Sequence, residues 1–165
     1  MKMFKPIFMV LLSVLFVTTF QSCKKDKSLS NEEEIEKALD EFVADLQSNP
    51  PDTADVSNRV KNYLSAQADF FYGSTVTLLD TSELAVSSPY WYRHNGSLSY
   101  SDLMDTSYHI NTQAWLRKPI DTGSAIWSDP YFDTGGGNIM MKTRSVPVYS
   151  GGKIIAVATT DLALE

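Results

Sequence analysis

Residues 139–162, IMMKTRSVPVYSGGKIIAVATTDL, contain the clearest structural signal in the sequence. It contains two extended runs rich in Val, Ile, Thr and Tyr, 139–149 and 153–162, which are joined by Ser150-Gly151-Gly152. Two such runs on either side of a glycine turn are typical of a β-hairpin. The sequence therefore predicts a pair of long antiparallel strands at the end of the chain.

The second of these strands has two different faces, because successive side chains of a strand point to opposite sides. Ala156, Ala158 and Thr160 share one face, and Ile155, Val157, Thr159 and Asp161 share the other. The alanine face is small enough for a long helix to pack closely against it. The other face ends in Asp161, a carboxylate that an apolar core excludes. We therefore expect a sheet with one structural face and one face that lines a pocket.

Two helices are predicted before the sheet. Ser30-Asn31-Glu32-Glu33 forms a capping box, which marks a helix start. The apolar residues that follow fall on one helical stripe, and they are Ile35, Leu39, Phe42, Val43 and Leu46. Asn49-Pro50-Pro51 ends this helix or bends it sharply. A second helix starts near Asp52 and Thr53, and its stripe consists of Val56, Val60, Tyr63, Leu64 and Phe71.

The middle of the chain changes to extended runs. Strands are predicted at 72–79, 84–86, 90–93 and 125–127, and Asn95-Gly96 forms a turn between extended segments. A short helix is expected from a cap at Asn111 or Thr112 through Arg117, with Pro119 ending it. Long helices, strands, one small helix and more strands make an α+β fold with a mostly antiparallel sheet.

Composition excludes several classes of protein. The 165 residues include 43% hydrophobic and 21% charged residues, which is the composition of a globular protein. The net charge of −6 argues against nucleic-acid binding, which requires a basic face. A single cysteine excludes a disulfide framework and a cysteine-cluster metal site.

Catalysis is not expected. His94 and His109 are the only histidines, and the chain has no Gly-x-Ser-x-Gly elbow for a serine hydrolase. An acid pair drawn from Asp129, Asp133 and Asp161 would suit a glycosidase, but no feature of the sequence singles such a pair out. The loop from Asp129 to Asn138 lacks the ligand spacing of a calcium site. We therefore expect no metal and no cofactor.

The N-terminus is typical of an export signal. Lys2 and Lys5 precede an uncharged run, Ile7–Phe20, that is shorter than the roughly 20 residues of a spanning helix. Phe20-Gln21-Ser22-Cys23 resembles a bacterial lipobox, although Phe20 and Gln21 depart from its usual pattern. This predicts a signal peptide over residues 1–22 and a lipidated Cys23. Residues 23–29 would form a tether, and 30–165 a domain on the outer side of the membrane.

Several motifs resemble a Cache sensor domain. They are Phe71-Tyr72-Gly73-Ser74, Ser88-Pro89-Tyr90-Trp91-Tyr92-Arg93, Trp127-Ser128-Asp129-Pro130-Tyr131-Phe132-Asp133, Gly135-Gly136-Gly137-Asn138-Ile139-Met140-Met141 and Val157-Ala158-Thr159-Thr160-Asp161-Leu162. The likeness covers roughly residues 30–165 and is closest to the membrane-distal, PAS-like half of double Cache modules. It implies a sheet of about five strands behind a long N-terminal helix, with a small-molecule pocket on the opposite face.

The resemblance also implies binding residues. Tyr108, Trp115, Tyr131, Asp133 and Asp161 fall where amino-acid-binding members carry their aromatic and acidic set. Gln113 stands where the carboxylate-clamping Arg would be, and Leu116 where a Tyr would be. Glutamine cannot replace a forked cationic donor. An amine, or another small metabolite without a free carboxylate, is therefore expected as ligand, unless Arg93 or Arg117 supplies the missing charge.

The sequence thus predicts a lipid-anchored domain in the periplasm or at the cell exterior. It would bind a small metabolite and pass the signal to a protein partner without catalysis. The alternatives are an adaptor lipoprotein that binds another protein, or a truncated relic of a larger receptor.

Overall fold

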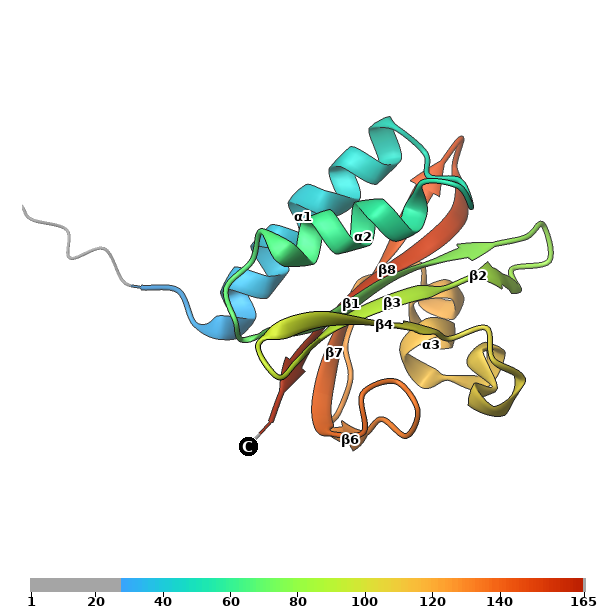
Figure 1. Ribbon diagram of the computed structural model, residues 1–165. Helices are drawn as coiled ribbons and strands as arrows, with labels where there is room; N and C mark the ends of the chain where they lie inside the picture. The colour runs from blue at the N-terminus through green and yellow to red at the C-terminus, as the bar shows by residue number, and fades with distance from the viewer. Residues whose placement is uncertain (1–27, 165) are drawn as a thin grey trace, which may run out of the picture.

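The computed structural model describes residues 28–164. Two N-terminal helices, α1 (Asn31–Ser48) and α2 (Val56–Ser65), cover one face of an antiparallel sheet (Figure 1). A shorter helix, α3 (Ala114–Thr122), lies on the opposite face together with two single 3-10 turns, Thr106–Tyr108 and Ile110–Thr112. The expected α+β architecture is confirmed.

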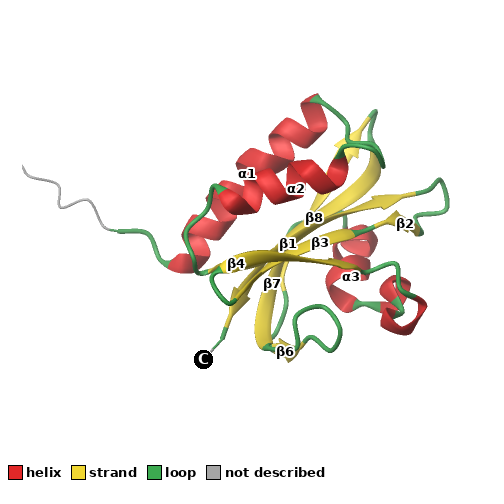
Figure 2. Ribbon diagram, in the orientation of Figure 1, coloured by secondary structure: helices red, strands yellow, loops and turns green. Residues whose placement is uncertain are grey.

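Within residues 28–164, the sheet has eight strands. Five long strands form its body in the order β4 (Ser97–Asp102), β3 (Pro89–His94), β1 (Phe71–Leu79), β8 (Lys153–Ala163) and β7 (Met140–Ser150). Three short strands are added to these. β2 (Ala85–Ser87) pairs with β1, and β5 (Ile126–Trp127) and β6 (Tyr131–Phe132) pair with β7. Figure 2 labels β2 and β6. The sheet of about five strands that the resemblance implies corresponds to the long members. The ranges predicted from the residues include four of these, at 72–79, 90–93, 139–149 and 153–162, and the short β2 and β5, but not β4.

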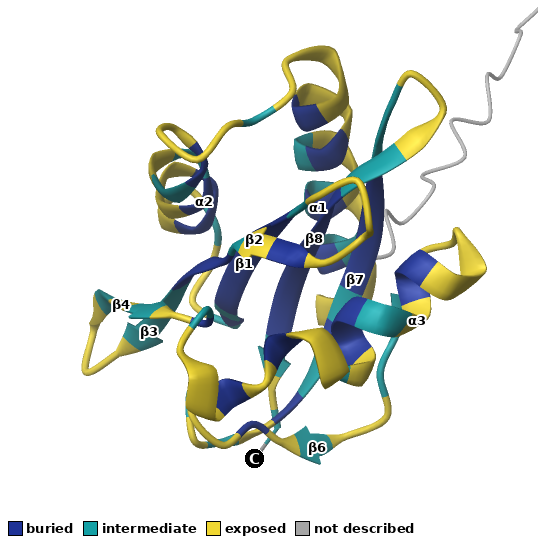
Figure 3. Ribbon diagram, turned by 90° about the vertical axis from the view of Figure 1, so that its right-hand side faces the viewer, coloured by how far each residue is buried: buried dark blue, intermediate teal, exposed yellow. Residues whose placement is uncertain are grey.

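The core between α1 and the sheet follows the predicted stripe. Ser30 Oγ accepts a hydrogen bond from the Glu33 amide at 3.2 Å, and the Glu33 carboxylate accepts one from the Ser30 amide at 2.8 Å, so the capping box is present. The buried face of α1 packs against Ala156 and Ala158 of β8, as the alanine face predicted. Figure 3 shows that β8 is buried over most of its length. Phe71 belongs to this core too.

Three local predictions were wrong. Phe71 opens β1 and does not extend the stripe of α2, which already ends at Ser65. Pro119 lies inside α3 and does not end it. The helix continues to Thr122 because one side of it is buried, including Pro119 itself, and tertiary packing outweighs one lost backbone hydrogen bond. Gln113, rather than Asn111 or Thr112, is the N-cap residue of α3.

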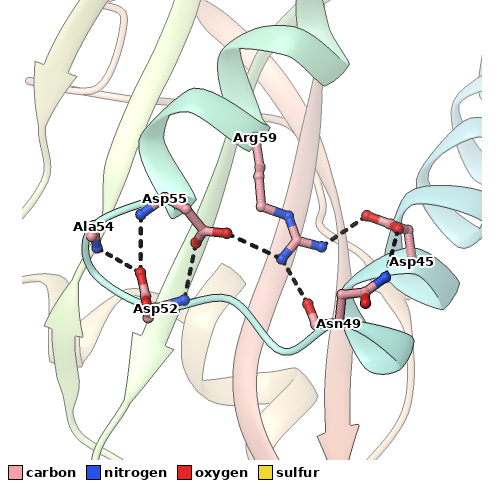
Figure 4. Close-up of polar contacts among 6 residues, drawn as sticks. All are labelled: Asp45, Asn49, Asp52, Ala54, Asp55 and Arg59. Carbon is pink, nitrogen blue, oxygen red and sulfur yellow. Dashed lines mark hydrogen bonds and ion pairs between the residues drawn. The ribbon is translucent and has the colours of Figure 1, made fainter.

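The bend between α1 and α2 is fixed by Arg59 (Figure 4). Its guanidinium donates to the Asn49 carbonyl at 2.6 Å and to the Asp45 carboxylate at 2.8 Å. Asp52 Oδ1 accepts from the Ala54 amide at 2.8 Å, which shapes the turn. The two helices are therefore held as one layer behind the sheet.

The predicted signal peptide and Cys23 lie outside the described residues. Among residues 28–164, no helix is both long and apolar enough to cross a bilayer.

Candidate functional site

A small cavity lies on the sheet face that α3 covers. Five predicted site residues line it together, and they are Tyr108, Trp115, Tyr131, Asp133 and Asp161. They come from a 3-10 turn, α3, β6, the loop after β6, and β8. The cavity measures about 10 Å³, which is about the space of one water probe, so a ligand requires its cover to move.

Asp161 forms the floor of the cavity and is 3% exposed. Antiparallel pairing sets it opposite Thr143 of β7, whose Oγ1 donates to Asp161 Oδ1 at 2.6 Å. Since that hydrogen is used, the Tyr131 hydroxyl donates to Thr143 Oγ1, at 2.8 Å. The Tyr90 hydroxyl donates to Asp161 Oδ2 at 2.9 Å. Each carboxylate oxygen therefore accepts one hydrogen bond from a neutral hydroxyl group.

Tyr90 reaches Asp161 only because Gly73 lies between them on the sheet. Gly73 is opposite Asp161 in β8 and opposite Tyr92 in β3. A Cβ atom at Gly73 would lie 2.2 Å from the Tyr90 hydroxyl oxygen. The missing side chain therefore opens the path by which the phenol crosses β1.

Asp133 approaches from the loop above the floor. It is 6% exposed, and its Oδ1 accepts a hydrogen bond from the Tyr108 hydroxyl at 2.9 Å. Trp115 Nε1 in turn donates to the Tyr108 oxygen at 3.2 Å. A Cβ atom at Gly136 would lie 2.0 Å from Asp133 Oδ2, so the glycine run lets the loop fold closely around this carboxylate.

The cavity is acidic. Among the described residues that line it there are two aspartates and no Lys, Arg or His. Burial raises the pKa of Asp161 to about 6, with a contribution from the charge of Asp133, while hydrogen bonds from Thr143 and Tyr90 oppose the rise. Burial also raises the pKa of Asp133, and the hydrogen bond from Tyr108 opposes this. Both shifts reflect carboxylates that lack a cation, and a bound cation would relieve them.

The other two predicted site residues lie elsewhere. Arg93 points to the helix face of β3, where it donates to the carbonyls of Phe71 at 2.9 Å and Gln67 at 2.7 Å. Gln113 occupies the N-cap position of α3 without a capping hydrogen bond from its side chain, and it donates to the Tyr108 carbonyl at 2.8 Å. Arg117 is on α3 and donates to the Glu83 carbonyl at 2.8 Å, outside the cavity. None of the three supplies the missing positive charge at the floor.

Two larger hollows adjoin the cavity. A pocket of about 700 Å³ shares Leu103 and Tyr108 with it, and a groove of about 250 Å³ between α3 and the β5–β6 loop shares Trp115 and Tyr131. Gln113 and Lys118 line the groove. Tyr108 and Trp115 therefore separate the acidic floor from two open spaces, and their movement would admit a ligand.

Sequence reasoning missed Tyr90 and Thr143 as residues of the site. Tyr90 stands inside the motif Ser88-Pro89-Tyr90-Trp91-Tyr92-Arg93, but the motif alone does not say which aromatic ring faces the cavity. The signal that finds Thr143 is its position opposite Asp161, which requires the strand register.

Residues 56–165 match a family described as methyl-accepting chemotaxis protein-like, first PDC sensor domain. The chain belongs to this family. The resemblance to Cache domains is thereby confirmed at the level of the PDC family and its sensor fold. None of the curated proteins matches this PDC domain significantly.

Solved structures share the fold of this PDC domain. The extracellular domain of soHK1S-Z6, assigned as a histidine kinase, is 26% identical with a TM-score of 0.67, over 81% of this chain and 53% of that one. The ligand-binding domain of the Pseudomonas aeruginosa PAO1 amino acid chemoreceptor PctC, in complex with GABA, is 20% identical with a TM-score of 0.56, over 80% and 56%. That of the Campylobacter jejuni chemoreceptor Tlp3, in complex with L-valine, is 18% identical with a TM-score of 0.57, over 77% and 50%. The PDC domain thus spans about half the length of these structures.

Proposed function

We propose that this PDC domain is an extracytoplasmic sensor that binds the ammonium group of a small amine and acts without catalysis. The observation that carries the proposal is the pair of buried carboxylates, Asp133 and Asp161, in a cavity whose described lining has no cationic side chain. Three aromatic residues, Tyr108, Trp115 and Tyr131, stand beside the acids. Acids and ring faces together suit a cation through ion pairing and cation–π contact.

The absence of an arginine at the floor favours an amine over an ordinary α-amino acid. A carboxylate next to the ammonium would lie against Asp133 and Asp161 without a cationic partner among the described lining residues. Burying an unpaired charge is strongly unfavourable. Gln113, at the position of the family's arginine, is already hydrogen bonded to the Tyr108 carbonyl. The ligand we propose therefore has no carboxylate near its amine.

The back of the cavity floor offers a route for the signal to α1. Lys142 and Arg144 flank Thr143 on β7, and they form ion pairs with Glu32 and Glu36 of α1, the second at 3.7 Å. Glu36 also accepts a hydrogen bond from Trp127 Nε1 at 2.7 Å. A ligand that binds the closed cavity more tightly than the open one would shift the population between the two states. The ion pairs between β7 and the first turns of α1 would then change with the state of the cavity.

Binding assays on the full chain in detergent test the ligand class. Small primary amines are expected to raise the melting temperature, because a ligand that binds only the folded state stabilises it. The N-acetylated counterparts lack the charge, and the matching α-amino acids add a carboxylate, so neither set should stabilise the protein comparably. Stabilisation by the acetylated compounds equal to that by the amines would contradict the proposal.

We also propose that a lipid on Cys23 anchors the domain to the outer side of a membrane. The support is the apolar run Ile7–Phe20, which ends just before Cys23. In cells given a labelled fatty acid, the wild-type chain should acquire the label and fractionate with membranes. The Cys23→Ala variant should remain unlabelled. Equal labelling of the two chains would refute lipidation at this residue.

A further inference from the structure

Two unused hydroxyl donors lie side by side on the cavity face of the sheet. Ser145 of β7 and Thr159 of β8 are directly opposite each other, and they are 0% and 2% exposed. Ser145 Oγ has no hydrogen-bond partner among residues 28–164. Thr159 Oγ1 accepts from the Thr75 amide at 3.3 Å, but its own hydrogen has no acceptor among the described residues. Buried polar groups without partners are rare in proteins.

The two hydroxyls lie at a fixed distance from the acidic floor. Thr159 precedes Asp161 by two residues on β8, so both point to the same face, about 6 to 7 Å apart along the strand. Thr159 lines the same cavity as Asp161. Helix α3 packs over β7 and β8 and covers this row. Outward movement of α3, which carries Trp115, would therefore uncover acids and hydroxyls together.

We propose that Ser145 and Thr159 form a second subsite, which donates hydrogen bonds to a neutral acceptor at the far end of the ligand. This inference rests on the proposed function and narrows it to amines that carry a hydroxyl or carbonyl oxygen. Both donors are uncharged, and no cationic side chain is among the described residues that line the cavity. A carboxylate would lack a cationic partner there. A second ammonium could donate to the two oxygens, but it would leave both hydroxyl hydrogens without an acceptor.

A matched series of four-carbon compounds tests the subsite, because a chain of this length places its end groups roughly 6 Å apart, close to two strand residues. The probes are butylamine, 4-aminobutan-1-ol, putrescine and γ-aminobutyrate, which differ only in the far group. Calorimetry on the full chain in detergent should give the amino alcohol an affinity at least about tenfold higher than that of the other three.

The variant Ser145→Ala should remove most of that advantage and leave the affinity for butylamine unchanged. It should also keep or raise the melting temperature of the free protein, since it removes an unpaired buried hydroxyl. Ser74→Ala is the matched control. Ser74 is equally buried, but its Oγ donates to the Thr159 carbonyl at 2.7 Å. This control should lower the melting temperature and keep the preference for the amino alcohol.

The outcomes separate the two proposals. Equal affinity for butylamine and the amino alcohol would overturn the subsite while the amine proposal stood. Tightest binding of putrescine or γ-aminobutyrate would overturn the subsite as well, in favour of a charged partner for the far group. No binding of any compound with an amine would instead count against the proposed function itself.

Discussion

The Asp161→Asn variant is expected to lose amine binding by at least about 100-fold, because truncating a buried charge pair leaves the ligand's cation without its counter-charge. Asparagine keeps the size of the side chain. Its amide can still meet Thr143 and Tyr90, whose hydroxyls both donate and accept. The fold should therefore survive, and the loss can be measured by calorimetry with the amines that stabilise the wild type.

The control for this experiment is Asp121→Asn. Asp121 is on the exposed side of α3 and pairs with Arg117 at 3.1 Å, so the variant makes the same change of charge on the helix that covers the cavity. Its affinity should equal that of the wild type. If Asp161→Asn binds amines as tightly as Asp121→Asn does, Asp161 is not the group that holds the ammonium.

The Asp161→Asn substitution should also stabilise the unliganded protein at neutral pH. Burial raises the pKa of Asp161 to about 6 from an ordinary value of 3.8, so the folded state favours the protonated form. The stability from this group is fully present below the unfolded pKa and is lost as the pH rises through about 6. At pH values well above that, the buried charge costs about 3 kcal/mol. Asparagine carries no such cost.

Urea unfolding of wild type and Asp161→Asn across this pH range measures the effect. The variant should be more stable by about 2 to 3 kcal/mol near neutral pH, and the difference should shrink toward zero near pH 4. The difference between the two proteins cancels the titration of groups that they share. A difference in unfolding free energy that stays constant with pH would show that burial does not disfavour the charged form of Asp161.

In the wild type, amine affinity should fall as the pH drops below about 6, because protonated Asp161 no longer attracts a cation.

The sequence predicted which side chains line the cavity better than it predicted their pairing. Ser150 pairs with Lys153 next to the hairpin turn. If this register continued without a shift, Lys142 would lie opposite Asp161. A register shift between Val148 and Tyr149 moves β7 by one residue and brings Thr143 there instead. Because a slip of one residue exchanges the faces of a strand, this bulge decides that the acid faces a hydroxyl and not a lysine. Hydrophobic alternation alone does not reveal such a shift.

In the helices too, the spacing of apolar residues predicted some features, whereas others depend on tertiary packing. The stripe of α1 was readable because its apolar residues recur with helical spacing and all pack on one core. Phe71 fitted the spacing of α2 and belongs to the same core, yet it reaches that core from β1. The position of Pro119 inside α3 depends on burial of that helix against the sheet, which no local preference contains. Arg93 likewise faces α2 because of its place in the alternation of β3.

The most direct test of the acidic cavity as an ammonium site is a crystal structure of the domain with the amine that stabilises it most. The amine nitrogen should lie within hydrogen-bonding distance of the carboxylates of Asp133 and Asp161, under Trp115 and Tyr131. An amine found in the groove lined by Gln113 and Lys118, with both carboxylates still bonded only to protein hydroxyls, would contradict it.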